Sequence, residues 1–287
     1  MVPFDEGPTL RRRRLGSELK RCREQAGMTQ EQVSKYFEWH AAKVTRIETA
    51  RVAVTPRDVK DLLTLYGVQD DEYREALMSL ARLSRERTWW TDYRDLMRPG
   101  NFVGLEAEAS GSRVWEPIVM PGLLQIEAYM RALMTVGRRS DAPESVDRRI
   151  ALRLRRQNRL TEANPLNLWA VIDESIVHRV VGGRSVMIDQ LQRLLDVGEL
   201  ANVTIQILPF TAGEHVFLGG SAALLEFPAR AHADVVYLEG LAGDYYEEQP
   251  HEVERYRVEF ERLADNALSV DDTAALIKRL RDDFSNS

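Results

Sequence analysis

The hydrophobic positions at the start of the chain recur with the spacing of an amphipathic helix. Residues 10–26 place Leu15, Leu19 and Cys22 on one face, and Gly27 follows where such a helix would end. Side chains three or four residues apart lie on the same side of a helix. The pattern therefore predicts a first helix with one buried stripe.

Four further helices are predicted before residue 88, and two of them carry clear start signals. Thr29 is placed to cap the second helix, with Gln32 three residues later in capping-box register. Thr55 and Pro56 open the fourth helix, with proline at the first helical position. The four helices are expected at about residues 29–37, 41–50, 55–66 and 71–85.

The second and third helices are short and meet at the turn Glu38-Trp39-His40. This is the layout by which a protein places one helix in the major groove of DNA. Residues 9–60 contain thirteen Lys and Arg against six Asp and Glu, a net +7. The chain as a whole carries −6, so the remainder carries −13. A basic head on an acidic body favours a DNA-binding module joined to a sensor or partner domain.

The remaining two thirds of the chain mix strand and helix patterns. Strands are predicted at about residues 112–116, 168–172, 203–208, 222–227 and 235–239. Helices are predicted at about residues 102–109, 122–136, 143–162, 184–200, 252–268 and 270–284. The order favours an α+β domain with a mixed sheet and terminal helices. We place the boundary at the composition shift before Trp89-Trp90, giving an all-α domain at residues 1–88 and a second domain at residues 89–287.

Composition excludes several classes of protein and site. The single cysteine, Cys22, permits no internal disulfide, and the five histidines lack ligand-like spacing. No cofactor or metal is therefore expected. The apolar runs are too short to cross a bilayer, and no secretory segment opens the chain. These features predict a cytoplasmic protein that does not bind membranes.

A catalytic role is not expected, because the chain has no nucleophile elbow, phosphate-cradling loop or metal motif. Asp173 and Glu174 follow a predicted strand, and Arg153, Arg156 and Gln157 are candidates to face them. These five residues are possible ligand or partner contacts. The alternatives are that the carboxylates start a helix or form buried ion pairs, and that the arginines belong to an exposed helix surface.

The segment from Leu19 to Gln30, together with Val33 and residues 44–48, resembles the XRE family of helix-turn-helix regulators, of the Cro and phage-repressor type. The resemblance covers about residues 10–85. It implies that Gln30 caps a helix N-terminus against a DNA phosphate. It also implies that Arg23 pairs with Glu48 inside the module, as a structural ion pair.

The recognition helix departs from the family pattern at its first turn. His40, Ala41 and Ala42 stand where relatives usually carry Ser or Gln, and alanine can only touch a thymine methyl group. Base reading is therefore expected from Lys43 and Arg46, with contributions from His40 and Thr45. The alternative is that Lys43 and Arg46 touch only phosphates. Arg51 is expected to contact the DNA backbone, and the alternative is that it is simply solvated.

The second domain resembles the C-terminal domain, of unsettled function, of actinomycete antitoxin-like regulators. The resemblance rests on Glu116-Pro117, residues 121–125, Tyr129, residues 153–157, Asp173-Glu174, Gln190-Leu191, residues 203–210, Gly213, residues 225–228 and residues 236–239. It implies regulation through a small partner protein encoded nearby. Two hypotheses stay open: a transcriptional regulator controlled by such a partner or a ligand, and an antitoxin-like protein that sequesters the partner. The XRE resemblance implies a homodimer on a two-fold operator.

Overall fold

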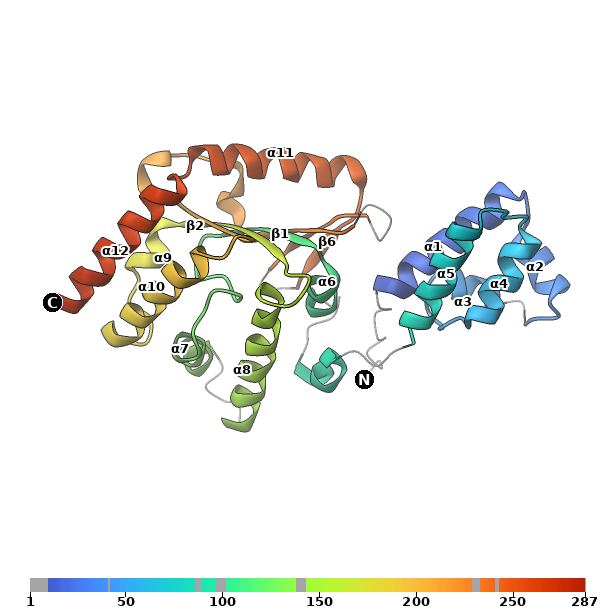
Figure 1. Ribbon diagram of the computed structural model, residues 1–287, viewed down its shortest axis with the longest axis horizontal. Helices are drawn as coiled ribbons and strands as arrows, with labels where there is room; N and C mark the ends of the chain where they lie inside the picture. The colour runs from blue at the N-terminus through green and yellow to red at the C-terminus, as the bar shows by residue number, and fades with distance from the viewer. Residues whose placement is uncertain are drawn as a thin grey trace. The chain divides into compact units, whose positions relative to one another are not determined.

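The chain divides into two compact units, residues 1–105 and residues 106–287. The computed structural model describes residues 10–40, 42–85, 89–96, 102–137, 143–228, 233–240 and 243–286. The predicted boundary after residue 88 stays a prediction, because residues 86–88 lie outside this described part. Figure 1 labels the elements of both units.

The first unit is all-α, as predicted, and its helices begin at their capping signals. Thr29 and Gln32 form the predicted capping box: the Thr29 hydroxyl accepts from the Gln32 N–H, and the Gln32 side chain accepts from the Thr29 N–H. Thr55 caps the fourth helix, with Pro56 at its first position. The helices are α1 (Leu10–Gln25), α2 (Gln30–Tyr36), α3 (Ala42–Glu48), α4 (Pro56–Leu65) and α5 (Asp71–Leu83), followed by the 3-10 helix η1 (Trp89–Leu96).

One hydrophobic core holds these helices together. Leu15 and Leu19 of α1 pack with Val33, Val44 and residues of α4 and α5, all of them buried. Each fully buried leucine contributes about 2 kcal/mol relative to an exposed one. Gly16 lets α1 approach α3 closely, because a Cβ there would lie 2.7 Å from the backbone oxygens of residues 47 and 48. Helix α3 therefore packs closely against α1.

The second unit contains a six-stranded mixed sheet in the order β3-β2-β1-β4-β5-β6. Strands β1, β2 and β3 are parallel, and β4, β5 and β6 continue from β1 in antiparallel pairs. This is the mixed sheet that the sequence predicts. The strands are β1 (Gly111–Glu116), β2 (Asn167–Asp173), β3 (Val203–Leu208), β4 (Ala222–Glu226), β5 (Val235–Leu238) and β6 (Tyr245–Glu247).

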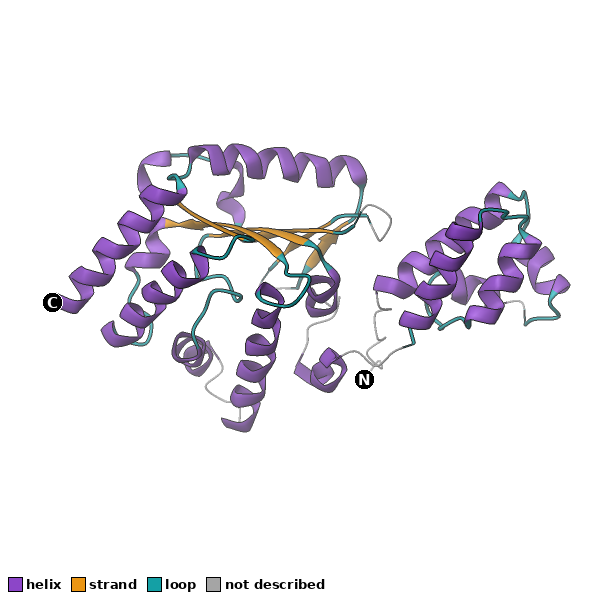
Figure 2. Cartoon of the chain, in the orientation of Figure 1, coloured by secondary structure: helices purple, strands orange, loops and turns teal. Residues whose placement is uncertain are grey.

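Helices cover both faces of the sheet (Figures 1 and 2). Helix α11 (Pro250–Asn266) crosses one face, and α7 (Glu127–Gly137), α8 (Pro143–Gln157) and α10 (Arg184–Gly198) lie on the other side of the sheet. Strand β2, which lies between the parallel strands β1 and β3, is accordingly buried along most of its length, as expected of a parallel strand covered on both faces. The remaining helices are α6 (Phe102–Glu108), α9 (Glu174–His178) and α12 (Val270–Asn286).

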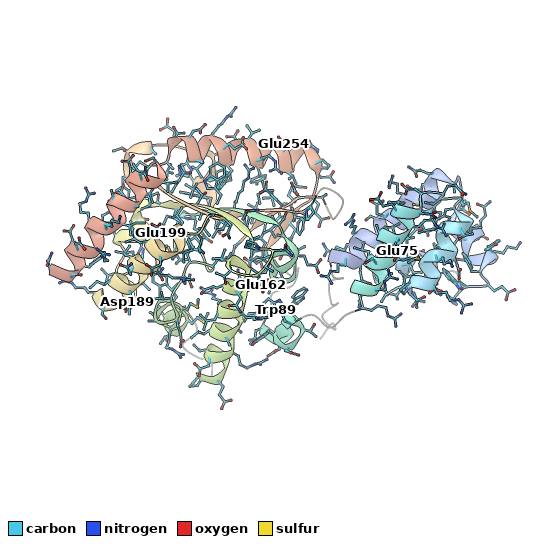
Figure 3. The ribbon with its side chains drawn as sticks, viewed as in Figure 1. Glu75, Trp89, Glu162, Asp189, Glu199 and Glu254 are labelled. Carbon is cyan, nitrogen blue, oxygen red and sulfur yellow. The ribbon has the colours of Figure 1, made fainter. Side chains whose placement is uncertain are left out.

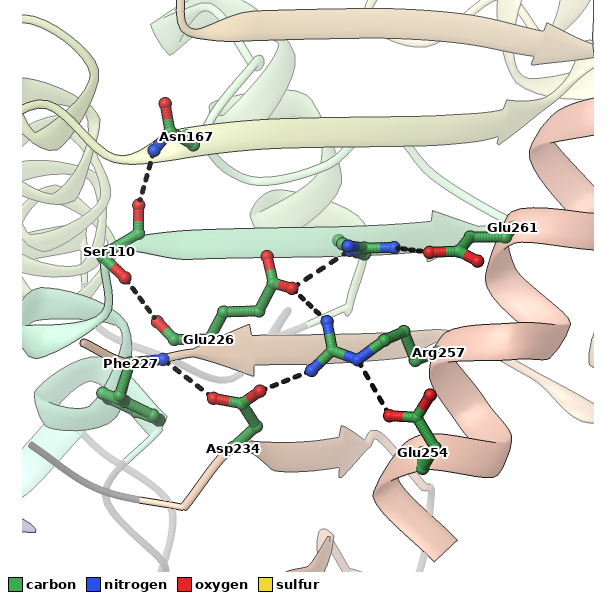
Figure 4. Close-up of polar contacts among 9 residues, drawn as sticks. Ser110, Asn167, Glu226, Phe227, Asp234, Glu254, Arg257 and Glu261 are labelled. Carbon is green, nitrogen blue, oxygen red and sulfur yellow. Dashed lines mark hydrogen bonds and ion pairs between the residues drawn. The ribbon is translucent and has the colours of Figure 1, made fainter. Parts of the chain in front are cut away.

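An ionic network fastens α11 to the sheet (Figure 4). Arg113 of β1 donates to Glu226 at the end of β4 at 3.2 Å and to Glu261 of α11 at 2.7 Å. Arg257 of α11 also pairs with Glu226, and with Asp234 before β5. Because both arginines reach the same carboxylate, the network fixes the position of α11 across three strands.

Some element boundaries differ from the predictions. The helix expected directly after Pro121-Gly122 begins only at Glu127, and residues 121–126 form turns and a connecting segment. The helix expected to reach residue 162 ends at Gln157 and passes into the 3-10 turn η2 (Asn158–Leu160). Strand β6 and helix α9 were not expected, because elements of three and five residues are too short to show a hydrophobic period.

Acidic side chains mark the outer surface of the second unit. Glu162, Asp189, Glu199 and Glu254 are all exposed (Figure 3). Among the described residues, no helix is both long enough and apolar enough to cross a membrane.

Candidate nucleic-acid interface

Helix α3 has one face in the core and one face in solvent. Val44, Ile47 and Glu48 are buried. Ala42, Thr45, Arg46 and Thr49, on or just after the helix, are exposed. The guanidinium group of Arg46 has no hydrogen bond or ion pair to any other described residue. It is therefore available to an external partner.

The buried side of α3 is tied to α1 and α2 by a polar network. Arg23 Nε donates to Glu48 Oε1 at 2.6 Å, and Arg23 Nη2 donates to Glu48 Oε2 at 3.0 Å. Both side chains are at most 8% exposed. The hydrogen bond to Glu48 raises the pKa of Arg23 above its ordinary value. The structure thus brings the two residues together as a bidentate buried pair.

Gln30 joins the same network through its side-chain amide. Its Nε2 donates to Glu48 Oε2 at 2.7 Å, and its Oε1 accepts from the Thr45 hydroxyl at 2.7 Å. The amide therefore links α2 to both the buried and the exposed side of α3. Contact between Gln30 and a DNA phosphate stays a prediction from the family resemblance.

Lys43 lies against its own unit. Its Nζ is 3.5 Å from the centre of the Trp39 ring and 3.8 Å from Asp58 Oδ2. A cation over an indole face and beside a carboxylate is held by both. Lys43 is 34% exposed in its side chain, so its charge still reaches the surface. This position suits a phosphate contact better than a reach into the groove.

The other predicted DNA contacts lie around the start and end of α3. His40 is exposed, and its Nδ1 accepts from the Ala42 N–H at 3.4 Å, near the helix start. Arg51 is exposed just beyond the helix. Ala41 lies outside the described residues.

Two candidate residues of the second unit, Arg153 and Gln157, hold the loop before α7, and a third, Arg156, binds α6. Arg153 Nη1 donates to Gln125 Oε1 at 2.7 Å. Gln157 Nε2 donates to the carbonyls of Gly122 and Gln125 at 3.1 and 2.6 Å. Arg156 forms a two-bond pair with Glu106 of α6, at 2.6 and 2.9 Å. The contacts of Arg153 and Gln157 explain why residues 121–126 form a fixed loop and not the first turns of α7.

Asp173 and Glu174 also make contacts within the second unit. Asp173 is the N-cap of α9, because its carboxylate accepts from the Ser175 N–H at 2.9 Å. Glu174 accepts from the Phe210 N–H at 2.8 Å and lies 3.2 Å from His178 Nε2. The two carboxylates therefore connect strand ends to the following loops, and the partners that hold them are Ser175, Phe210 and His178, not the three candidate residues of α8.

Three residues that matter to this geometry were not singled out from the sequence. Trp39 and Asp58 hold Lys43, and Glu106 pairs with Arg156. Glu106 could have been recognised from the sequence, because it is the one charged residue in the otherwise apolar segment at residues 102–107. No local sequence pattern points to Trp39 and Asp58, because their contact with Lys43 depends on tertiary packing.

Comparisons with known proteins find two family models that match different parts of the chain. A family model described as a helix-turn-helix domain matches residues 14–77. A second model, described as a domain of unknown function (DUF5753), matches residues 100–279. No curated protein and no solved structure matches the chain.

Proposed function

Because the chain belongs to the DUF5753 family and carries a helix-turn-helix domain ahead of that region, we propose that it is a sequence-specific transcriptional regulator. In this proposal α3 enters the major groove, and the second domain responds to a small partner protein or a ligand. The helix-turn-helix match supports DNA binding. Sequence specificity and control by a second component are our proposals.

The main support for the proposal is that α3 has one face fixed in the first unit and the other face exposed. Its buried face is fixed by Arg23, Glu48 and Gln30, while Arg46 and Thr45 project from the other face. A reading helix has to be held rigidly, because bidentate hydrogen bonds to a base edge tolerate little displacement. The same network that supports the helix therefore orients the residues that would read DNA.

Arg46 is the main base-reading residue of the proposal. Its planar guanidinium group matches the O6 and N7 acceptors of guanine in the major groove. Lys43, Arg51 and His40 would add contacts with the phosphate backbone, which position the protein without specifying sequence.

A single small module covers little DNA and binds weakly, so the proposal includes a homodimer on a two-fold operator. Two copies of α3 would then contact half-sites about one helical turn apart. The operator selected by the protein should accordingly contain an inverted repeat, and its complex should contain two chains.

Substitution of Arg46 by alanine tests the base contact. The preferred site is first selected from a random duplex library, and affinity is then measured by mobility shift at fixed salt concentration. Arg46→Ala is expected to weaken binding by about 1–3 kcal/mol and to relax the preference at one base position of each half-site. Unchanged affinity and unchanged preference would refute the assignment of Arg46.

Arg46→Lys is the matched control for charge. Lysine keeps the positive charge but loses the planar pair of donors. Binding to non-specific DNA should therefore stay close to that of the wild type, while the preference at the same base position is again lost. Full retention of preference by Arg46→Lys would assign Arg46 to a phosphate.

A further inference from the structure

The side chains that fix α3 form one hydrogen-bond chain from the core of the first unit to its surface. Arg23 donates to both oxygens of Glu48, at 2.6 and 3.0 Å. Gln30 Nε2 donates to Glu48 Oε2 at 2.7 Å, and the Thr45 hydroxyl donates to Gln30 Oε1 at 2.7 Å. The chain begins at the buried Arg23 and ends at the exposed Thr45. The direction of each hydrogen bond can therefore be followed from one end to the other.

The buried end of the hydrogen-bond chain sets its direction. The guanidinium group of Arg23 has only donors, and the carboxylate of Glu48 that pairs with it has only acceptors. The side-chain amide of Gln30 has both, so it could face a neighbour with either end. Against a carboxylate only its NH2 group can form a hydrogen bond. The Gln30 amide is therefore held with Nε2 on Glu48 and Oε1 toward Thr45.

This orientation commits the hydroxyl proton of Thr45. The contact between Thr45 Oγ1 and Gln30 Oε1 is 2.7 Å, and the amide oxygen carries no proton, so the hydroxyl supplies it. A threonine hydroxyl has one proton and two lone pairs. Its one proton is thus used inside the protein. The Thr45 oxygen, on the exposed side of α3, offers only lone pairs to an external partner.

The fixed polarity of this hydroxyl distinguishes two pairs of bases in the major groove. Adenine and cytosine present an exocyclic amino group there, whereas guanine and thymine present a carbonyl oxygen. A threonine hydroxyl that is free to rotate can donate or accept, so it can bind all four bases. A hydroxyl that can only accept forms a hydrogen bond with an amino group and repels a carbonyl oxygen.

We propose that Thr45 is a specificity-determining residue that accepts a hydrogen bond from the exocyclic amino group of adenine or cytosine, and that the hydrogen-bond chain from Arg23 through Gln30 gives it this preference. The inference rests on the proposed function, because it requires α3 to enter the major groove. Arg46, the next residue, has only donors and takes the complementary part toward guanine. At one position of each half-site, one strand should therefore carry adenine or cytosine in preference to guanine or thymine.

Selection from a random duplex library by the full-length protein gives the first test. Thr45→Val removes the hydroxyl and keeps the branched shape of the side chain. This variant is expected to lose the preference for adenine or cytosine at one position and to bind the wild-type site about threefold to tenfold more weakly, the effect of one hydrogen bond. Thr45→Ser is the matched control, because it keeps the hydroxyl and should keep the preference.

Base analogues then test the amino group itself. Purine in place of adenine, or 2-pyrimidinone in place of cytosine, lacks only the exocyclic amino group. At the position identified by selection, the analogue should weaken binding of the wild-type protein about threefold to tenfold more than it weakens binding of Thr45→Val. Because the analogue disturbs the DNA duplex equally for both proteins, the difference reports the contact with Thr45. Equal losses for the two proteins would overturn the proposal.

Gln30→Met tests whether the hydrogen-bond chain sets the preference. Methionine has a similar length but cannot accept the Thr45 proton, so the hydroxyl becomes free to donate or accept. Selection by this variant should give nearly equal use of the four bases at the Thr45 position, while guanine stays preferred at the Arg46 position. Gln32→Met is the matched control, because Gln32 lies on the same helix and bonds to Thr29 outside this chain. An unchanged preference in folded Gln30→Met would refute the role of the chain.

The results distinguish failure of this inference from failure of the proposed function. A selected site in which Thr45→Val alters no position, or in which guanine or thymine is preferred at the altered position, overturns the inference and leaves a sequence-specific regulator. Wild-type protein that selects no sequence refutes the proposed function, and the inference falls with it. Circular dichroism of each variant confirms that a lost preference does not come from an unfolded domain.

Discussion

Replacing Arg23 by alanine should lower the free energy of unfolding of the helical unit by about 3 kcal/mol. The loss follows from what the substitution leaves behind. Glu48 is 3% exposed in its side chain and accepts two hydrogen bonds from Arg23. Without Arg23 its charge stays buried, and the Gln30 amide still donates one hydrogen bond to it.

Urea denaturation followed by hydrogen-exchange mass spectrometry measures this effect, because peptides of α1 to α4 report on the helical unit separately from the sheet. Arg21→Ala serves as the control. Arg21 also pairs with a carboxylate, Glu18, but its side chain is 53% exposed, so its loss should cost only about 0.5 kcal/mol. Equal protection in Arg23→Ala and wild type would contradict a stabilising pair.

A double substitution distinguishes the net contribution of the ion pair to stability from the destabilisation caused by leaving Glu48 buried without Arg23. Arg23→Met with Glu48→Leu removes both charges and fills the space with apolar atoms. Replacing a buried ion pair in this way is often nearly neutral, so we expect most of the lost stability to return. DNA binding should not return fully, because the Gln30 amide loses the Glu48 carboxylate that accepts its hydrogen bond and helps to hold it against α3.

Much of the fold is readable from local signals. Thr29 with Gln32, and Thr55 with Pro56, mark helix starts by backbone chemistry that acts within a few residues. The all-α first domain and the mixed sheet with terminal helices were accordingly predicted correctly. The match to a helix-turn-helix model confirms the family resemblance of the first domain. The match to DUF5753 confirms the resemblance of the second.

The parts that local signals miss depend on contacts between distant residues. Gln125 and Gln157 fix the loop at residues 121–126, and only the folded chain brings them together. The placement of Lys43 over Trp39 is likewise tertiary. The sequence therefore predicts the candidate reading helix but does not distinguish the exposed Arg46 from Lys43, which is held by Trp39 and Asp58.

The second large prediction concerns Glu116. The free energy of unfolding of the second unit should fall as the pH rises. Its folded pKa is about 8, compared with 4.5 for an ordinary glutamate, because burial and the charge of Glu239 disfavour the ionised form. Between these two values the folded state holds a proton that the unfolded state releases. The free energy of unfolding must therefore decrease with rising pH across this window and level off above about pH 8.

Glu116→Gln removes this titration and keeps a side chain of similar shape. At pH 9 the variant should be more stable than wild type by about 3 kcal/mol, and at pH 5 the two should agree within about 0.5 kcal/mol. Urea denaturation at both pH values, read by hydrogen exchange in peptides of β1 and β2, gives the difference. The exposed Glu162→Gln is the matched control and should show no such pH dependence.

The test also identifies the source of the perturbation. Glu239→Gln removes the neighbouring charge and leaves Glu116 buried, so it should recover only part of the stability gained by Glu116→Gln at pH 9, because burial is the larger cause. If Glu239→Gln recovered all of it, the repulsion between the two carboxylates would be the dominant cause. If Glu116→Gln gained nothing at pH 9, the Glu116 carboxylate would have to ionise at the end of β1 at no cost in stability, and the raised pKa would be wrong.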